Sequence, residues 1–257
     1  MYRISNSIIM RGVVAALFLV TAASASVIGN LDIGSGGMIT VTITSSTFSA
    51  DPSSTPPGPP WDAEVAVGTT LAFTGGPLVT TEGVDINSPL TAASVGENNF
   101  LTFAAHPNLV FSLLGIGPGV ANTNCAGVTM IGQSCSVFAG SPIILTLTST
   151  GTSASFSVNG KASDTGIAGL ASGSNYNGSL SEPLVQPLPN GAAPTPANIQ
   201  AYFCPGGVCD TTKSISTPFS GNFFATTVPE PQTTALVLGG LLVLLGKVGM
   251  RRLNRSR

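Results

Sequence analysis

Charged side chains and histidine are scarce in this sequence. Of its 257 residues, 8% are Asp, Glu, Lys or Arg, 6% are aromatic, and a single residue is His. A charged fraction of about 25% is usual for a soluble globular domain, so this chain needs either membrane segments or a surface of uncharged polar residues. The length allows one large or two modest domains, each with a substantial core.

The few basic residues lie almost entirely at the two ends of the chain. Between residues 26 and 228 only Lys161 and Lys213 are basic, whereas ten residues are acidic, a formal net charge of −8. Phosphate binding needs clustered Lys and Arg, so this balance argues against a nucleic-acid partner. Ser and Thr are expected to replace charges on the solvent face of the body, since Thr suits an exposed strand position.

The first residues have the order of a secretory signal peptide. Arg3 and Arg11 precede the apolar run Gly12–Val20, and Ala23-Ser24-Ala25 offers the small residues that a signal peptidase accepts. The alternative, a first transmembrane helix, is disfavoured because this run is shorter than the roughly 20 residues that span a bilayer. We predict a signal peptide over residues 1–25, a mature chain that begins near Ser26, and export to an oxidising compartment.

The other end carries a motif, an apolar segment and a basic cluster. Val228–Pro231 precedes a largely apolar segment, residues 233–250, which Lys247 interrupts. Its length is near the lower limit for spanning a bilayer, and the basic end predicts a cytoplasmic C-terminus with the body outside. A buried core helix is disfavoured, since the segment has no polar face. We predict one transmembrane helix over about 233–250, followed by the stop-transfer residues Arg251, Arg252, Arg255 and Arg257.

Pro229, Glu230 and Pro231, the apolar segment and the Arg cluster, in this order, resemble the PEP-CTERM sorting signal of Gram-negative bacteria. The resemblance covers residues 228–257, and Lys247 departs from it. It implies recognition by exosortase, a membrane-embedded Cys protease-transpeptidase. It also implies processing near Pro229–Pro231, a transient inner-membrane anchor, and delivery to the cell surface or extracellular matrix.

The body, residues 26–227, has the pattern of an all-β domain. Apolar and hydroxyl residues alternate in Ile39–Thr44, Ile143–Ser149 and Ala154–Val158, as in half-buried strands. Asn159-Gly160 predicts a tight hairpin turn, with Lys161–Asp164 as the return strand. Many short strands separated by Gly, Pro, Asn and Ser predict an antiparallel β-sandwich, with a jelly roll as a variant. Weaker strand predictions are Val65–Phe73, Phe100–Ala104, Leu109–Leu114, Tyr176–Leu180, Ile199–Phe203 and Ser214–Phe224.

Two Pro-rich segments, Asp51–Pro60 and Gln186–Ala197, are predicted as loops. The second could join two subdomains. We favour one continuous sandwich, because Ile199–Phe224 is too short to bury a core alone. No part of the body shows a helical apolar period with caps.

Four cysteines allow three pairings, and the sequence does not decide among them. Proximity and export favour Cys125 with Cys135 and Cys204 with Cys209. A zinc site is the alternative, which we disfavour because the spacings are not of the C-x₂-C type and the only histidine is distant in sequence.

Candidates for catalysis are few. His106 is the only histidine, and no G-x-S-x-G context accompanies it, so we interpret it as a turn residue and assign no catalytic residue. Five acidic residues lie between positions 62 and 97, and we interpret them as solvent-exposed groups at the edge of the domain. Paired carboxylates among them could alternatively support glycoside hydrolysis. Asp62 with Glu64, or the Asp85–Asn87 segment, could also bind a structural Ca²⁺, but neither supplies the six ligands that this ion takes. These acidic residues are Asp62, Glu64, Glu82, Asp85 and Glu97. We therefore predict no metal site and no cofactor.

Trp61, the only tryptophan, follows a Pro-rich segment. Its indole could stack on a sugar while Asp62 binds sugar hydroxyls, but a ring that plugs one end of the sandwich is favoured. The first hypothesis is therefore a non-enzymatic surface or matrix protein with a structural or adhesive body. The alternative is a carbohydrate-binding module for exopolysaccharide, and a secreted glycoside hydrolase is the least favoured.

Overall fold

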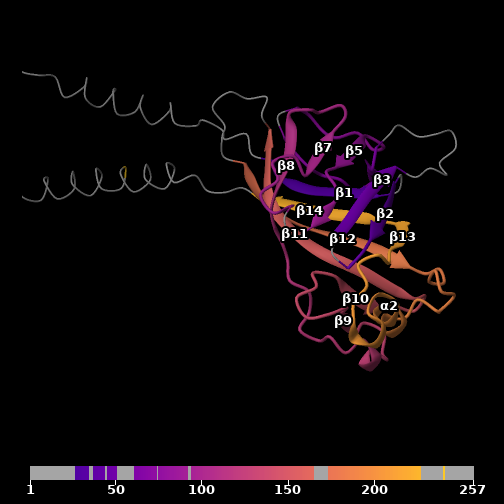
Figure 1. Ribbon diagram of the computed structural model, residues 1–257. Coiled ribbons are helices and arrows are strands. Elements are labelled where there is room, and N and C mark those ends of the chain that lie inside the picture. Colours follow the sequence, from indigo (N-terminus) through magenta and orange to yellow (C-terminus); the bar gives the residue numbers. More distant parts are fainter. Residues whose placement is uncertain are drawn as a thin grey trace, which may run out of the picture.

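The computed structural model describes residues 27–226, except 35–36, 44, 51–60, 74, 92–93 and 165–172, and also Gly240. Strands dominate these residues, and the helix α2 (Pro196–Phe203) and the short turns η2 (Cys125–Gly127) and η3 (Pro205–Gly207) accompany them (Figure 1). The strands are β1 (Gly29–Gly34), β2 (Gly37–Val41), β3 (Ser45–Ala50), β4 (Ala63–Val65), β5 (Gly83–Ile86), β6 (Leu90–Thr91), β7 (Leu101–Phe103), β8 (Leu109–Ile116), β9 (Ser134–Ser136), β10 (Ile144–Leu147), β11 (Thr152–Asp164), β12 (Ser174–Leu184), β13 (Ile215–Pro218) and β14 (Ser220–Thr226).

Eight of these strands close into an antiparallel barrel, in the order β12-β14-β1-β4-β5-β7-β8-β11, with β11 paired again to β12. The predicted β-sandwich is therefore wrong, because the main sheet closes on itself instead of facing a second sheet across the core. Strands of barrels and sandwiches share the same alternation of buried and exposed residues, so the alternation predicts strands but not their closure.

The two longest strands, β11 and β12, extend beyond the barrel. They pair with each other from Thr152 opposite Leu184 to Ala162 opposite Ser174, whereas β8 pairs only with the second half of β11. The first half of β11 pairs instead with β10, which pairs with β9. In Figure 1 the two strands run from the barrel toward β9, β10 and α2. The second sheet, β13-β2-β3-β6, packs on this extension, since Ile39 of β2 and Phe156 of β11 line one small void.

Aromatic side chains fill the barrel. Phe100, Phe111, Tyr176 and Phe223 are at most 1% exposed. Their rings meet at tilted or edge-to-face angles, with centroids 5.0–6.2 Å apart. Eight strands leave an interior that side chains can fill, so the barrel has a packed core.

The predicted hairpin at Asn159-Gly160 is also wrong, because β11 runs through both residues without a turn. The pairing of β11 with β8 shifts by one residue between them, which is a β-bulge. A Cβ on Gly160 would lie 2.7 Å from the Tyr176 ring, so glycine is needed here for close packing. The Asn159-Gly160 pair therefore looks like a turn signal in the sequence, although its glycine is required for packing inside the barrel.

The helix α2 replaces the strand predicted at Ile199–Phe203 and the end of the loop predicted before it. Thr195 caps the helix, since its Oγ1 accepts a hydrogen bond from the Asn198 amide at 3.3 Å, and Pro196 occupies the first turn. The helix has only eight residues and three of them are buried, so its period is too short to be read from the sequence.

Both predicted ends fall outside the described residues. The signal peptide (1–25), the sorting motif Pro229, Glu230 and Pro231, and the basic residues Arg251, Arg252, Arg255 and Arg257 are not among them, and of the segment 233–250 only Gly240 is. Within the part of the chain that the structure describes, no helix has the length and apolar character needed to cross a membrane. The transmembrane helix of the predicted fold class is therefore not found among the described residues.

Candidate functional site

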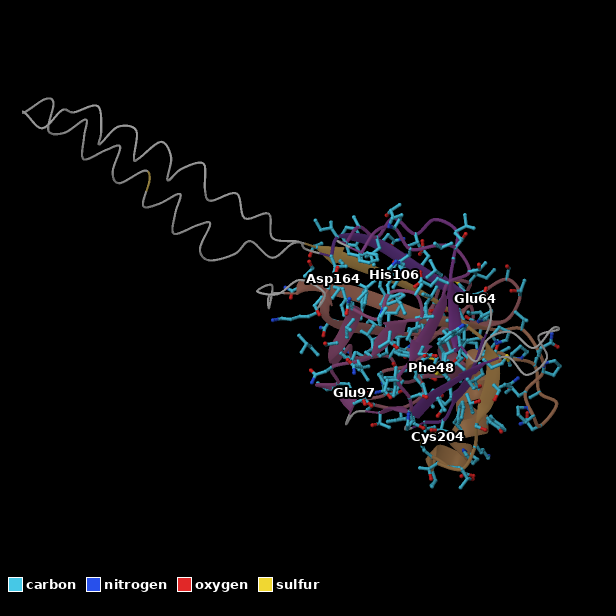
Figure 2. The ribbon with its side chains drawn as sticks, turned by 90° about the horizontal axis from the view of Figure 1, so that it is seen from above. Phe48, Glu64, Glu97, His106, Asp164 and Cys204 are labelled. Atoms are coloured by element: carbon cyan, nitrogen blue, oxygen red, sulfur yellow. A yellow bond between two sulfur atoms is a disulfide. The ribbon has the colours of Figure 1, made fainter. Side chains whose placement is uncertain are left out.

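The four cysteines form the two expected disulfides, Cys125–Cys135 and Cys204–Cys209. Both disulfides lie near the end of the molecule that holds α2 and β9. In Figure 2, Cys204 lies at this end and Asp164, at the end of β11, lies on the far side of the molecule. Because all four sulfur atoms are paired, none of them is a thiol nucleophile or a thiolate ligand for a metal.

Trp61 and Asp62 stand just before β4 and pack on β5. The half-buried indole of Trp61 lies over Gly83 and leaves no room for a Cβ there. Asp62 Oδ2 accepts a hydrogen bond from the Ile86 amide at 3.0 Å. Burial raises the pKa of Asp62, this hydrogen bond lowers it, and the negative charge of Asp85 raises it further. Burial also raises the pKa of Asp85. The two predicted ligand contacts thus help to join β4 to β5.

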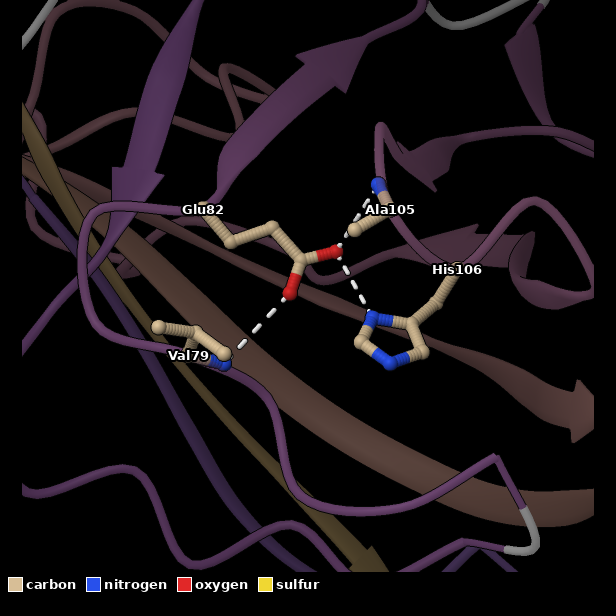
Figure 3. Close-up of polar contacts among 4 residues, drawn as sticks. All are labelled: Val79, Glu82, Ala105 and His106. Atoms are coloured by element: carbon tan, nitrogen blue, oxygen red, sulfur yellow. Dashed lines mark hydrogen bonds and ion pairs between the residues drawn. The ribbon is translucent and has the colours of Figure 1, made fainter.

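Glu82 and His106 form a hydrogen-bonded pair that joins two loops at one end of the barrel (Figure 3). Glu82 Oε1 accepts hydrogen bonds from His106 Nδ1 at 2.8 Å and from the Ala105 amide at 3.2 Å, and Oε2 accepts one from the Val79 amide at 3.4 Å. His106 also meets the ring of Phe73 edge-on, with centroids 5.1 Å apart. These contacts give the pair a role in holding the loops, which the sequence did not indicate.

The remaining acidic residues do not gather around this pair. Figure 2 shows Glu64, Glu97 and His106 at separate places on the molecule. Among the described residues, no group of three His, Cys, Asp or Glu side chains could hold a metal ion. Among the residues that the structure describes, the acids therefore form no cluster of metal ligands.

A hollow of about 530 Å³ lies between α2 and the Cys125–Cys135 loop. Its walls carry small or apolar residues such as Ala126, Phe138 and Ala201. The Gln200 amide in its wall is already used, because Nε2 donates to the carbonyls of Thr123 and Val137 and Oε1 accepts from the Cys125 amide. The hollow thus has no free polar group from this residue to orient a ligand.

The outer side of four neighbouring barrel strands, β1, β14, β12 and β11, carries mainly amides and hydroxyls. We call this surface the polar face. In Figure 1 its strands lie next to one another in the middle of the molecule. Its residues are Asn30, Asp32, Ser220, Asn222, Phe224, Thr226, Asn175, Asn177, Ser179, Ser181, Ser157, Asn159 and Lys161, all of them partly or fully exposed.

The strand register aligns these residues in rows across the sheet. One row is Asn30, Phe224, Asn177 and Asn159, and the next is Asp32, Asn222, Ser179 and Ser157. Neighbouring members of a row lie on neighbouring strands, which are about 4.8 Å apart. The register thus brings together residues that are distant in sequence.

The side chains on β1 and β14 are held by hydrogen bonds to one another. Asn222 Nδ2 donates to Asn30 Oδ1 at 2.8 Å and also to Asp32 Oδ1. Asn30 Nδ2 donates to Asp32 Oδ2 at 2.7 Å. Beside this network, the ring of Phe224 is 54% exposed. The face therefore combines one exposed ring with ordered donors and acceptors, an arrangement suited to binding a ligand rather than to acid–base chemistry.

Sequence reasoning missed the polar face, although a signal is present in the strands. Asn and Ser occupy the outward positions of residues 175–181, and Ser220, Asn222, Phe224 and Thr226 occupy those of 220–226. Only the register shows that these two segments are neighbours. Comparison with protein-family models, with curated proteins and with solved structures finds no match to this chain.

Proposed function

We propose that the protein is a non-enzymatic, adhesive protein of the cell surface or extracellular matrix of a Gram-negative bacterium. The observation that carries this proposal is the polar face, an exposed array of amides and hydroxyls on a closed barrel. Such a surface can contact a hydrated polymer outside the cell without performing chemistry on it. Two disulfides support an oxidising compartment, since such bonds are rare in the cytosol.

The two ends of the chain are the basis of the proposed route of export and processing. Signal peptidase removes residues 1–25, and the PEP-CTERM-like tail holds the chain transiently at the inner membrane with its basic residues in the cytoplasm. Exosortase then processes the chain near Pro229–Pro231 and delivers the barrel to the cell surface or the matrix.

A secreted glycoside hydrolase receives less support. Asp62 and Asp85 are close enough for the charge of one to raise the pKa of the other, as paired carboxylates in such enzymes do. However, one oxygen of Asp62 already accepts the Ile86 amide at 3.0 Å, and Trp61 beside it is packed on Gly83. Binding is therefore the better-supported role.

The processing of the tail tests this proposal. We expect mass spectrometry of the surface-associated protein, from producing cells that carry an exosortase, to find a mature chain that lacks Arg257. The variant Glu230→Ala should stay unprocessed in the cell envelope, whereas the matched control Glu64→Ala, which changes an acid of the barrel, should be processed like the wild type. Surface protein that still ends at Arg257 would contradict the proposed route.

A further inference from the structure

We propose that the polar face binds a neutral polysaccharide, with Phe224 stacking against one sugar ring. This inference rests on the proposed adhesive function outside the cell and names its ligand. The phenyl ring is 54% exposed on β14, and the register places Asn30 and Asn177 directly beside it on the neighbouring strands. An exposed ring flanked by two amides presents an apolar platform between hydrogen-bonding groups.

A sugar ring matches this arrangement in its chemistry. Its C–H groups form an apolar face that can lie on a phenyl ring, and its hydroxyls project from the ring edge. The amides on both sides can donate to these hydroxyls and accept from them. Because neighbouring strands are about 4.8 Å apart, both amides lie within reach of one sugar that covers Phe224.

The hydrogen bonds among Asn30, Asp32 and Asn222 prepare the face for binding. Asn222 donates to the side chains of both other residues, and Asn30 donates to Asp32. Side chains that are already held in place lose less conformational entropy when a ligand binds. The next row continues through Ser179 to Ser157, so hydroxyls and amides extend across four strands and fit a chain of sugars.

The few charges of the polar face and the negative net charge of the body favour a neutral polymer over an anionic one. Asp32 and Lys161 are the only charged residues of the polar face, and the carboxylate of Asp32 already accepts two amide N–H groups. The body has a formal net charge of −8, which repels an anionic polymer. A protein partner would need a broad apolar centre in the interface. Among the residues that define the face, Phe224 is the one large apolar side chain, and Ile28 and Leu114 are exposed at its two edges.

Affinity electrophoresis of the oxidised full chain tests the proposal. The native gels contain a soluble neutral glucan, a galactomannan, the neutral fraction of the producing cells' own exopolysaccharide, or an anionic polyuronate. We expect at least one neutral polymer, and not the polyuronate, to retard the wild type. Phe224→Ala should weaken this retardation at least about fivefold, the contribution of an aromatic contact. The matched control is Ile131→Ala, which removes an apolar side chain that is 70% exposed on a disulfide-linked loop, and it should bind like the wild type.

Several outcomes would overturn the inference. They are no retardation by any neutral polymer, retardation by the polyuronate alone, and retardation that survives Phe224→Ala. Self-association of the wild type without polymer, abolished by Phe224→Ala in sedimentation, would assign the face to a second copy of the chain instead. Near-UV circular dichroism checks that each variant folds. Correct tail processing combined with any of these outcomes would reject the ligand and leave the proposed export route standing.

Discussion

Glu182 is the residue whose position conflicts most with its chemistry. It lies on the inward side of β12 between Leu180 and Leu184, directly opposite Ala154, and is 5% exposed. Its Oε2 has no hydrogen-bond partner among the described residues. The residues around the two small voids that it lines, from β2, β10, β11, β12, α2 and β13, include no other charged or titratable side chain, and Thr42 and Ser141 are among the few polar ones. Burial raises its pKa to about 8.

This raised pKa predicts a pH dependence of stability. The folded chain keeps the Glu182 proton up to about pH 8, whereas an unfolded chain releases it near pH 4.5. Between these values the folded state binds more protons, so the free energy of unfolding should fall as pH rises from 4.5 to 8. Glu182→Gln should remove this part of the pH dependence, and urea unfolding of both proteins at pH 5 and pH 8 measures it. The same loss of stability in the variant and the wild type would show that Glu182 is not the cause.

At the scale of the strand, β11 depends on glycine where it crosses the barrel. A Cβ on Gly160 would lie 2.7 Å from the Tyr176 ring and closer still to the Ser112 carbonyl. We therefore expect Gly160→Ala to destabilise the protein by about 1–3 kcal/mol, as overpacking of buried sites does. In Gly34→Ala, the matched control on β1, the new methyl would meet only Ala66 at 3.7 Å and should be tolerated. Urea unfolding of both variants provides the comparison, and equal stability would contradict this packing.

Alternation of residue types predicted individual strands well and their connections poorly. The segments Leu109–Leu114 and Tyr176–Leu180 both lie within strands, because one side of each is consistently apolar or small. Most of Val65–Phe73 is not a strand, since only Val65 belongs to β4. The two disulfide pairings could be predicted from proximity along the chain, because each links cysteines at most ten positions apart.

At the scale of the whole molecule, the candidate site depends on closure of the sheet. Asn30 and Asn222 are 192 positions apart, yet their side chains share a hydrogen bond, since β1 and β14 are neighbours in the barrel. No local pattern contains this pairing, so the polar face could not be found before the register was known. The low charge, in contrast, was visible in the composition and anticipated a surface on which Ser and Thr hydroxyls replace charged groups.

The location and thiol state of the barrel in living cells test the account most directly. Producing cells are treated with a membrane-permeable alkylating reagent, and the intact mass of the protein is measured before and after protease is added outside the cells. We predict four unmodified, disulfide-linked cysteines, an N-terminus near Ser26, and loss of the barrel to the external protease. A cytosolic chain that resists the protease, keeps residues 1–25 and carries alkylated cysteines would contradict the account.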